Sequence, residues 1–175
     1  PDEQRGHLRA RGLDGFLAQG FDVTGVDIVR HPAYRGDFIK ADIRDLNGSL
    51  MFDRADVICA SPPCTQFTRH HLRCWYPQEP APDMSLVDAT FRICRESGVP
   101  FIIENVRGAR PFFKAAGYGP PVAHVGSFYL WGTGVPPLLP SYVQKSAVHW
   151  SGRRADRRAY IPDLISHAAA RWHAA

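Results

Sequence analysis

Short apolar runs alternate along the chain with segments whose apolar positions recur at helical spacing. The clearest helix is expected at residues 84–96, which carry a broad apolar face and are followed by Gly98 and Pro100. Less regular helices or helical turns are expected at residues 2–19, 46–52, 112–116 and 162–172. Runs rich in β-branched or aromatic residues predict strands at residues 21–28, 37–43, 55–60, 101–106 and 126–132. Strands that alternate with helices favour an α/β fold with a mostly parallel sheet.

Residues 65–82 show no regular period and are expected to be an irregular loop. A long loop in a compact domain is uncommon and is usually functional. This one carries cations and aromatic rings, which are the side chains that contact phosphates and stack on bases: Arg69, His70, His71, Arg73, Trp75 and Tyr76.

The composition limits the class of protein. A chain of 175 residues suits one compact domain, residues 1–175. Its net charge of +4 permits a nucleic-acid partner but does not require one. Four cysteines are too few for a disulfide framework, which favours a reducing, intracellular setting. We expect no membrane partner, because no apolar run is long enough to span a bilayer and no signal peptide is visible.

Polar side chains stand at the ends of the predicted strands. Asp27 and Asp42 end two of them, Cys64 follows a third after two prolines, and Glu104 and Asn105 end a fourth. The carboxyl ends of parallel strands share one edge of a sheet, where α/β proteins bind ligands. A thiolate can add to an electron-poor ring carbon, and a neighbouring carboxylic acid can stabilise the charge that develops. A pyrimidine is such a ring.

Less specific interpretations stand beside this one. Cys64 is also compatible with a buried structural cysteine, and Asp27 with a solvated carboxylate. Two cysteines and two histidines between residues 64 and 74 could in principle bind zinc, but their spacing matches no common zinc pattern, and we expect no metal. The four residues are Cys64, His70, His71 and Cys74. Basic residues near the C-terminus suit either a solvated face or phosphate contact. They are Arg153, Arg154, Arg157 and Arg158.

Four short motifs, in order, resemble those of DNA (cytosine-5)-methyltransferases, especially compact phage-type members. The segment 61–64, Ser-Pro-Pro-Cys, is similar to the family's Pro-Cys motif, and 104–106, Glu-Asn-Val, to its Glu-Asn-Val motif. Residues 20–28 resemble the segment whose acidic residue binds the ribose of S-adenosylmethionine, and Asp42 the acidic residue that contacts adenine. Phage-type members also share a segment like 126–132 and an Ile-Pro like that at 161–162. The resemblance spans residues 20–131.

The resemblance implies a Rossmann-like fold that uses S-adenosylmethionine and methylates carbon 5 of cytosine in DNA through a covalent adduct on Cys64. It implies that Glu104 hydrogen-bonds the ring and that Asn105 positions the loop carrying the cysteine. The implied catalytic residues are Cys64, Glu104, Asn105 and Pro63. The implied cofactor-binding residues are Asp27, Ile28, Asp42, Ile43 and Pro62. The implied substrate-binding residues are Arg69, Arg107 and Ser61.

Other expectations concern features that depart from the family. No Gly-rich turn for the cofactor's methionine end precedes Gly12, so we expect the family's first strand to be missing from this chain. Thr65 stands where the family usually has Gln, and the chain has no room for a sizeable target-recognition domain. Carbon-5 modification of a free pyrimidine nucleotide and a non-catalytic paralogue that binds nucleic acid therefore stay open. We expect a cytoplasmic protein of a bacterium or a phage-infected host cell, with room for a partner subunit or a homo-oligomer.

Overall fold

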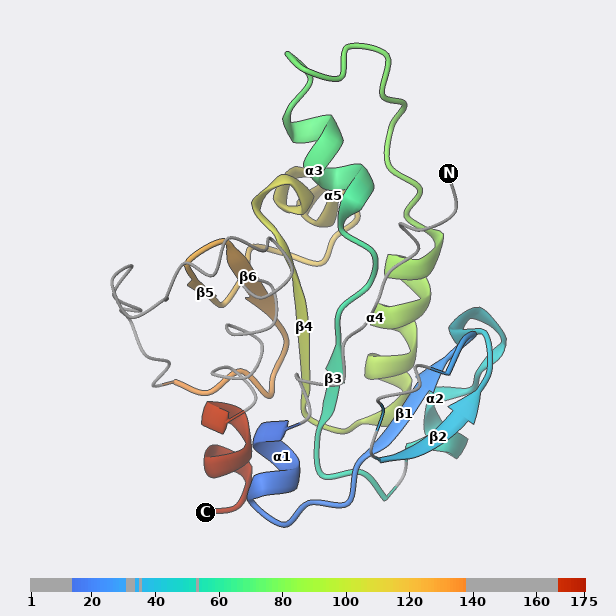
Figure 1. Ribbon diagram of the computed structural model, residues 1–175, viewed down its shortest axis with the longest axis vertical. Helices are drawn as coiled ribbons and strands as arrows, with labels where there is room; N and C mark the ends of the chain where they lie inside the picture. The colour runs from blue at the N-terminus through green and yellow to red at the C-terminus, as the bar shows by residue number, and fades with distance from the viewer. Residues whose placement is uncertain (1–13, 31–33, 35, 53, 138–166) are drawn as a thin grey trace. The chain divides into compact units, whose positions relative to one another are not determined.

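The computed structural model describes residues 14–30, 34, 36–52, 54–137 and 167–175. They belong to two compact units, one from residues 1–42 and 136–175 and the other from residues 43–135, and each unit is treated by itself (Figure 1). The predicted helix at residues 2–19 lies mostly outside the described residues. The same holds for Ile161-Pro162 and for the arginines at positions 153–158.

The described part of the first unit contains two helices and a pair of parallel strands. Helix α1 (Asp14–Ala18) is followed by β1 (Thr24–Asp27) and β2 (Asp37–Lys40). The register of β1 and β2 sets Thr24 opposite Asp37 and Asp27 opposite Lys40. Residues 167–173 form a further helix, within the range predicted for the last one. Strand β1 lies within its predicted range and is shorter at both ends, whereas β2 begins at Asp37 as predicted and ends three residues early.

The second unit is built on a four-stranded mixed sheet in the order β3-β4-β6-β5. Its strands are β3 (Ile58–Ala60), β4 (Phe101–Val106), β5 (Ala123–Val125) and β6 (Phe128–Trp131). Strand β3 is parallel to β4, whereas β6 is antiparallel to both β4 and β5. The sequence predicted β3, β4 and β6 but missed β5, whose three residues form a hairpin with β6 through Gly126 at a φ of 58°.

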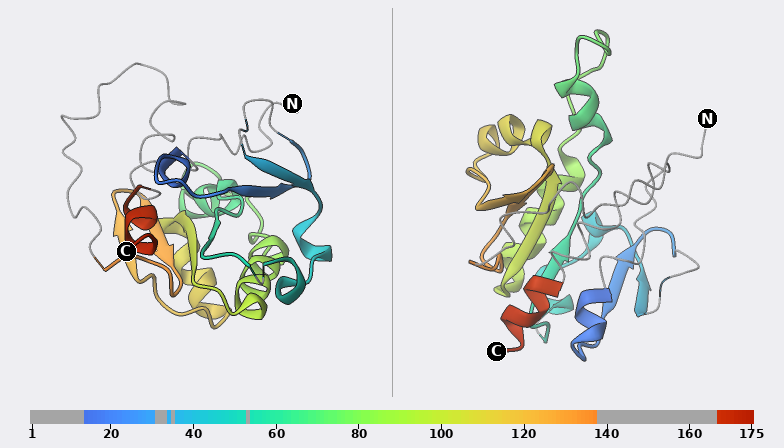
Figure 2. Two further views of the ribbon diagram at one scale, coloured as in Figure 1. Left: turned by 90° about the horizontal axis from the view of Figure 1, so that it is seen from below. Right: turned by 60° about the vertical axis from the view of Figure 1, so that its left-hand side comes forward.

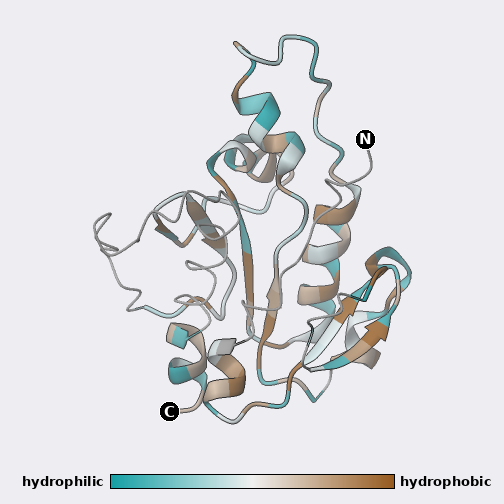
Figure 3. Ribbon diagram, viewed as in Figure 1, coloured by the Kyte–Doolittle hydropathy of each residue, from teal (hydrophilic) through white to brown (hydrophobic). Residues whose placement is uncertain are grey.

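Helix α4 (Ser85–Ser97) covers one face of this sheet, as Figures 1 and 2 both show. Val87, Phe91 and Cys94 of the helix join Ile103 of β4 in the hydrophobic core. Figure 3 shows apolar residues along β3, β4 and the helix face that meets them. The helix ends at Gly98, whose φ of 68° lies in the left-handed region that glycine adopts without strain. The predicted helix at residues 84–96 is therefore confirmed to within one residue at each end.

Shorter helices connect these elements. They are η2 (Ile43–Asp45), α2 (Gly48–Met51), α3 (Thr65–His71), η3 (Arg107–Ala109) and α5 (Arg110–Ala115). The prediction of an irregular loop at residues 65–82 is wrong for its first third, which is α3. Tertiary packing accounts for the difference, since Phe67 is buried and its ring contacts the rings of Phe112 and Phe113 at centroid distances of 5.7 Å.

The predicted α/β class is confirmed. Among the strands that the structure describes, the pairs β1–β2 and β3–β4 are parallel as expected, and the antiparallel pairings are the two that involve β6. Antiparallel strands added beside a parallel pair are common in α/β sheets. No helix of the described ranges is long and apolar enough to cross a membrane.

Candidate functional site

The register of β3 and β4 brings two of the predicted motifs side by side. Ile58 lies opposite Phe101, and Ala60 lies opposite Ile103. Continued by one and then two residues past Ala60, the same register sets Ser61 beside Glu104 and Pro62 beside Asn105. Strand β3 ends at Ala60, directly before Ser61, whereas Glu104 and Asn105 lie within β4 and pair there with Leu130 and Tyr129 of β6. The parallel strands therefore bring Ser61 and Pro62 beside Glu104 and Asn105 at one end of β3 and β4. The prediction also placed Asp27 and Asp42 at this edge, but they lie at or after the ends of β1 and β2, which form a separate two-stranded sheet.

Asn105 joins the two motifs through its side chain. Its Nδ2 donates a hydrogen bond to the carbonyl oxygen of Pro62 at 3.0 Å, and its Oδ1 accepts one from the backbone N–H of Val106 at 2.9 Å. The side chain is fully buried, so neither bond competes with bulk water. Asn105 thus holds the backbone carbonyl two residues before Cys64.

Glu104 is half-buried and is hydrogen-bonded by the side chain of Ser61. Burial raises its pKa from 4.5 to about 7, because a charged carboxylate is poorly solvated there, and the bond from Ser61 opposes this rise. A carboxyl group of this kind is partly protonated at neutral pH. It can then donate a hydrogen bond to an acceptor, which an ordinary glutamate at pH 7 cannot do.

Cys64 lies at the first turn of α3 and is half-buried. Its carbonyl oxygen accepts hydrogen bonds from the backbone N–H and the hydroxyl of Thr68, at 3.0 and 3.1 Å, so the residue is part of the start of the helix. Cys94 contrasts with it, because Cys94 is enclosed in the core and burial raises its pKa to about 12. A thiol with that pKa is a poor nucleophile.

Gly108 is a site residue that the sequence reasoning missed. It is buried in η3, two residues after Val106, and a Cβ at this position would overlap the carbonyl oxygen of Phe67 in α3. The absence of a side chain lets η3 pack directly against the helix that begins after Cys64. The signal available in the sequence was a glycine directly after the Glu-Asn-Val segment and Arg107, and only the packing of α3 reveals why glycine is needed there.

The two predicted substrate-binding arginines differ in their surroundings. Arg69, in the last turn of α3, lies 3.9 Å from a carboxylate oxygen of Glu79, and its guanidinium lies 5.9 Å from the ring centre of Tyr76. It therefore ties α3 to the segment that follows. Arg107 is exposed at the start of η3, directly after Val106. Its position at the end of β4 leaves it available to a ligand at this sheet edge.

Three of the predicted cofactor-binding residues belong to the first unit. Asp27 ends β1, and its Oδ1 accepts a hydrogen bond from the backbone N–H of Val29 at 3.1 Å. Ile28, the next residue, is 57% exposed, and Asp42 lies two residues beyond β2. A strand-end carboxylate accepts bonds from sugar hydroxyls, and an exposed Ile offers an apolar surface to a base.

The two remaining residues of that prediction lie in the second unit. Ile43 is half-buried at the start of η2, and Pro62 is buried with its carbonyl oxygen bound by Asn105. Pro63, predicted as catalytic, is exposed between Pro62 and Cys64. The two prolines cannot donate to a strand ladder, so the pairing of β3 with β4 ends before Cys64.

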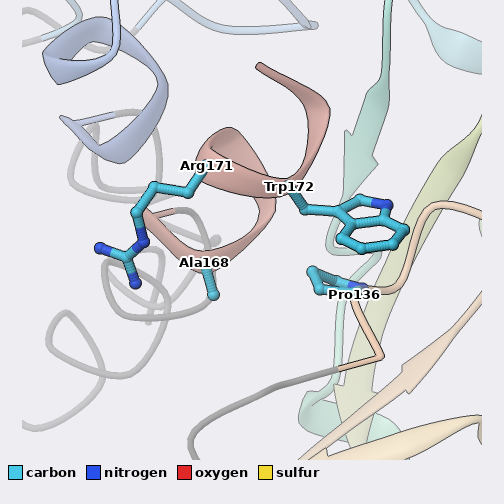
Figure 4. A pocket seen from close by; sticks show the side chains of 4 residues that line it. All are labelled: Pro136, Ala168, Arg171 and Trp172. Atoms are coloured by element: carbon cyan, nitrogen blue, oxygen red, sulfur yellow. The ribbon is translucent and has the colours of Figure 1, made fainter. Parts of the chain in front are cut away.

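A hollow of about 220 Å³ lies elsewhere, in the first unit. It is lined by Pro136, Ala168, Arg171 and Trp172, and Figure 4 shows the ring of Trp172 facing Pro136. None of the predicted site residues lines it. Within the ranges that the structure describes, no three His, Cys, Asp or Glu side chains are grouped so that they could hold a metal ion, and this includes the cysteines and histidines of residues 64–74.

Comparisons of the chain with protein-family models, with curated proteins and with solved structures found no match.

Proposed function

We propose that the protein is a DNA (cytosine-5)-methyltransferase with a Rossmann-like fold. The observation that carries the proposal is the joining of the Ser-Pro-Pro-Cys and Glu-Asn-Val segments at one end of β3 and β4, through Asn105 and the carbonyl of Pro62. Cys64 and Glu104 are 40 residues apart in the sequence, yet Glu104 lies on β4 and Cys64 follows β3, the parallel neighbour of β4. A nucleophile and a partly protonated acid are what addition to a pyrimidine requires.

The chemistry follows from these two groups. The thiolate of Cys64 forms a bond to carbon 6 of cytosine, and the electron pair of the 5,6 double bond moves into the ring. The carboxyl of Glu104, with its pKa of about 7, donates its proton in a hydrogen bond to ring nitrogen 3 and stabilises that charge. Carbon 5 thereby becomes nucleophilic. Once it carries a methyl group, loss of its proton expels the Cys64 thiolate and restores the aromatic ring.

S-adenosylmethionine, bound by Asp27, Ile28 and Asp42, would supply an electrophilic methyl group for carbon 5. The carboxylate at the end of β1 and the exposed apolar side chain after it support this assignment, because they suit a ribose and an adenine. Duplex DNA would have to present the cytosine outside the base stack, since carbon 6 is not accessible within it. The net charge of +4 favours such a polyanion.

A mechanism-based substrate tests the proposal. An oligonucleotide with 5-fluorocytosine cannot lose a proton from carbon 5, so in the presence of S-adenosylmethionine it should remain bonded to the protein in denaturing gels. We expect the adduct with the wild type and with Cys74→Ser, whose exposed thiol lies in the same region, but not with Cys64→Ser.

Two results would contradict the proposal in different ways. Absence of any adduct with the full chain would refute the transferase. Transfer of labelled methyl to dCMP, with none to an oligonucleotide, would assign the same chemistry to a free nucleotide.

A further inference from the structure

The segment after α3 carries an exposed apolar tip. Trp75 is 78% exposed, and Leu72 and Tyr76 beside it are also exposed. The tip is held in shape by backbone hydrogen bonds from the N–H groups of Trp75 and Tyr76 to the carbonyl of Leu72, at 2.8 and 3.1 Å. The folded segment therefore exposes the large aromatic ring of Trp75 to water, where the ring lowers solubility and adds nothing to the core.

Positive charge surrounds this tip. Residues 65–82 contain arginines and histidines but one acidic residue, Glu79, and that carboxylate already pairs with Arg69. Arg73 is exposed, two residues before Trp75, and makes no ion pair with any other residue that the structure describes. The tip therefore combines an apolar ring with an uncompensated cation.

This combination suits a nucleic-acid strand better than a protein surface. A base offers a flat face to an aromatic ring, and the neighbouring phosphate offers a negative charge to an arginine. In a paired duplex the base faces are covered by their neighbours, so a protruding ring gains contact only where a base is unpaired. A protein partner with an apolar patch would bury Trp75 but would leave Arg73 uncompensated.

We propose that Trp75 stacks on an unpaired base of single-stranded DNA while Arg73 contacts its phosphate, so that residues 72–76 form a single-strand binding surface. The choice of DNA as the nucleic acid rests on the proposed function. The proposal adds to that function a surface that binds a strand whose bases are unstacked. Arg69 and Glu79 hold the surface in place, since their ion pair joins α3 to the far side of the segment.

Binding of a fluorescein-labelled dT12 oligonucleotide, followed by anisotropy with the full chain, tests this inference. The probe contains no cytosine, so it reports stacking and not the reaction of Cys64. Trp75→Ala should weaken binding about 10-fold or more, and Trp75→Phe should retain most of it. Trp172→Ala is the matched control, because Trp172 is about half exposed but belongs to the first unit, and it should leave binding unchanged. Arg73→Ala should make the slope of log K against log salt concentration less steep by about 0.7, the value for one phosphate contact on a single strand.

Three results would overturn the inference. They are absence of dT12 binding by the wild type, equal binding by Trp75→Ala, and an equal loss by that variant on dT12 and on a dA·dT duplex. The last result would assign the segment to the duplex backbone. Trp75-dependent binding without a 5-fluorocytosine adduct would refute the methyltransferase alone, and an adduct with Trp75-independent binding would refute this surface alone.

Discussion

The side-chain nitrogen of Asn105 donates a hydrogen bond to the carbonyl oxygen of Pro62, 43 residues away in the sequence. The same amide accepts a bond from the N–H of Val106, so one buried side chain satisfies backbone groups on two strands. Backbone groups that have left the sheet ladder need such partners when they are buried. The bond makes the position of the Cys64 turn depend on a residue at the end of β4.

Replacement of Asn105 should destabilise the protein and reveal this dependence. Asn105→Ala leaves the carbonyl of Pro62 and the N–H of Val106 without partners, at a cost of about 1–3 kcal/mol in denaturant unfolding. Asn105→Asp keeps the acceptor for Val106 but can donate to Pro62 only when the new carboxyl is protonated. Its stability relative to the wild type should therefore rise as the pH falls from 8 to 4. A relative stability that is the same at both pH values would contradict the contact.

The protonation of Glu104 should appear as a pH dependence of stability. Burial raises the folded-state pKa from 4.5 to about 7, so the folded protein binds more protons than the unfolded chain between these values. Stability from this group is present below pH 4.5 and is lost as the pH rises to about 7, by up to about 3 kcal/mol. Glu104→Gln should match the wild type near pH 4 and exceed it at pH 8. Asp56→Asn, at an exposed carboxylate, should show no such divergence.

Ser61 should tune this titration. Its hydrogen bond lowers the pKa of Glu104, in opposition to burial, so Ser61→Ala should raise that pKa further. The effect of Glu104→Gln on the unfolding free energy can be measured against pH, once in the wild type and once in Ser61→Ala. In Ser61→Ala this effect should stop changing, that is, reach its plateau, at a higher pH than in the wild type. Ser127→Ala, at an exposed hydroxyl, serves as the control. An unchanged plateau would show that Ser61 does not hold the carboxyl.

The sequence predicted those parts of the fold that local patterns determine. Helix α4 has an apolar face and a glycine stop, and β4 begins with an apolar run at residues 101–103, so both were identified to within one residue at each end. Helix α3 was missed because it is short and its stability comes from burying Phe67 against α5, a contact that no local pattern encodes. Strand β5 was missed for a similar reason, since three residues carry no detectable period.

The candidate site likewise contains features that the sequence predicted and features that it did not. The polar residues at strand ends could be identified from the sequence, because a parallel sheet places such residues at one edge. The role of Gly108 could not, since it depends on the approach of η3 to α3. The hydrogen bond from Ser61 to Glu104 depends on the register of β3 with β4, which the sequence does not determine. The sequence analysis therefore assigned Ser61 to substrate binding and did not predict its contact with Glu104.

Gly108 should control the position of Cys64. In Gly108→Ala the new Cβ meets the carbonyl oxygen of Phe67, a backbone atom of the helix that starts after Cys64, so α3 must shift. Displacement of a reacting group by about 1 Å can slow a reaction about 100-fold, and we expect adduct formation on 5-fluorocytosine DNA to slow at least 10-fold. Gly117→Ala is the matched control, because its φ of 80° imposes a backbone cost of about 1–2 kcal/mol while nothing lies within 4 Å of its Cβ. It should lose stability and keep its rate. Equal rates for the two variants would mean that the contact of η3 with α3 does not set the geometry of the cysteine.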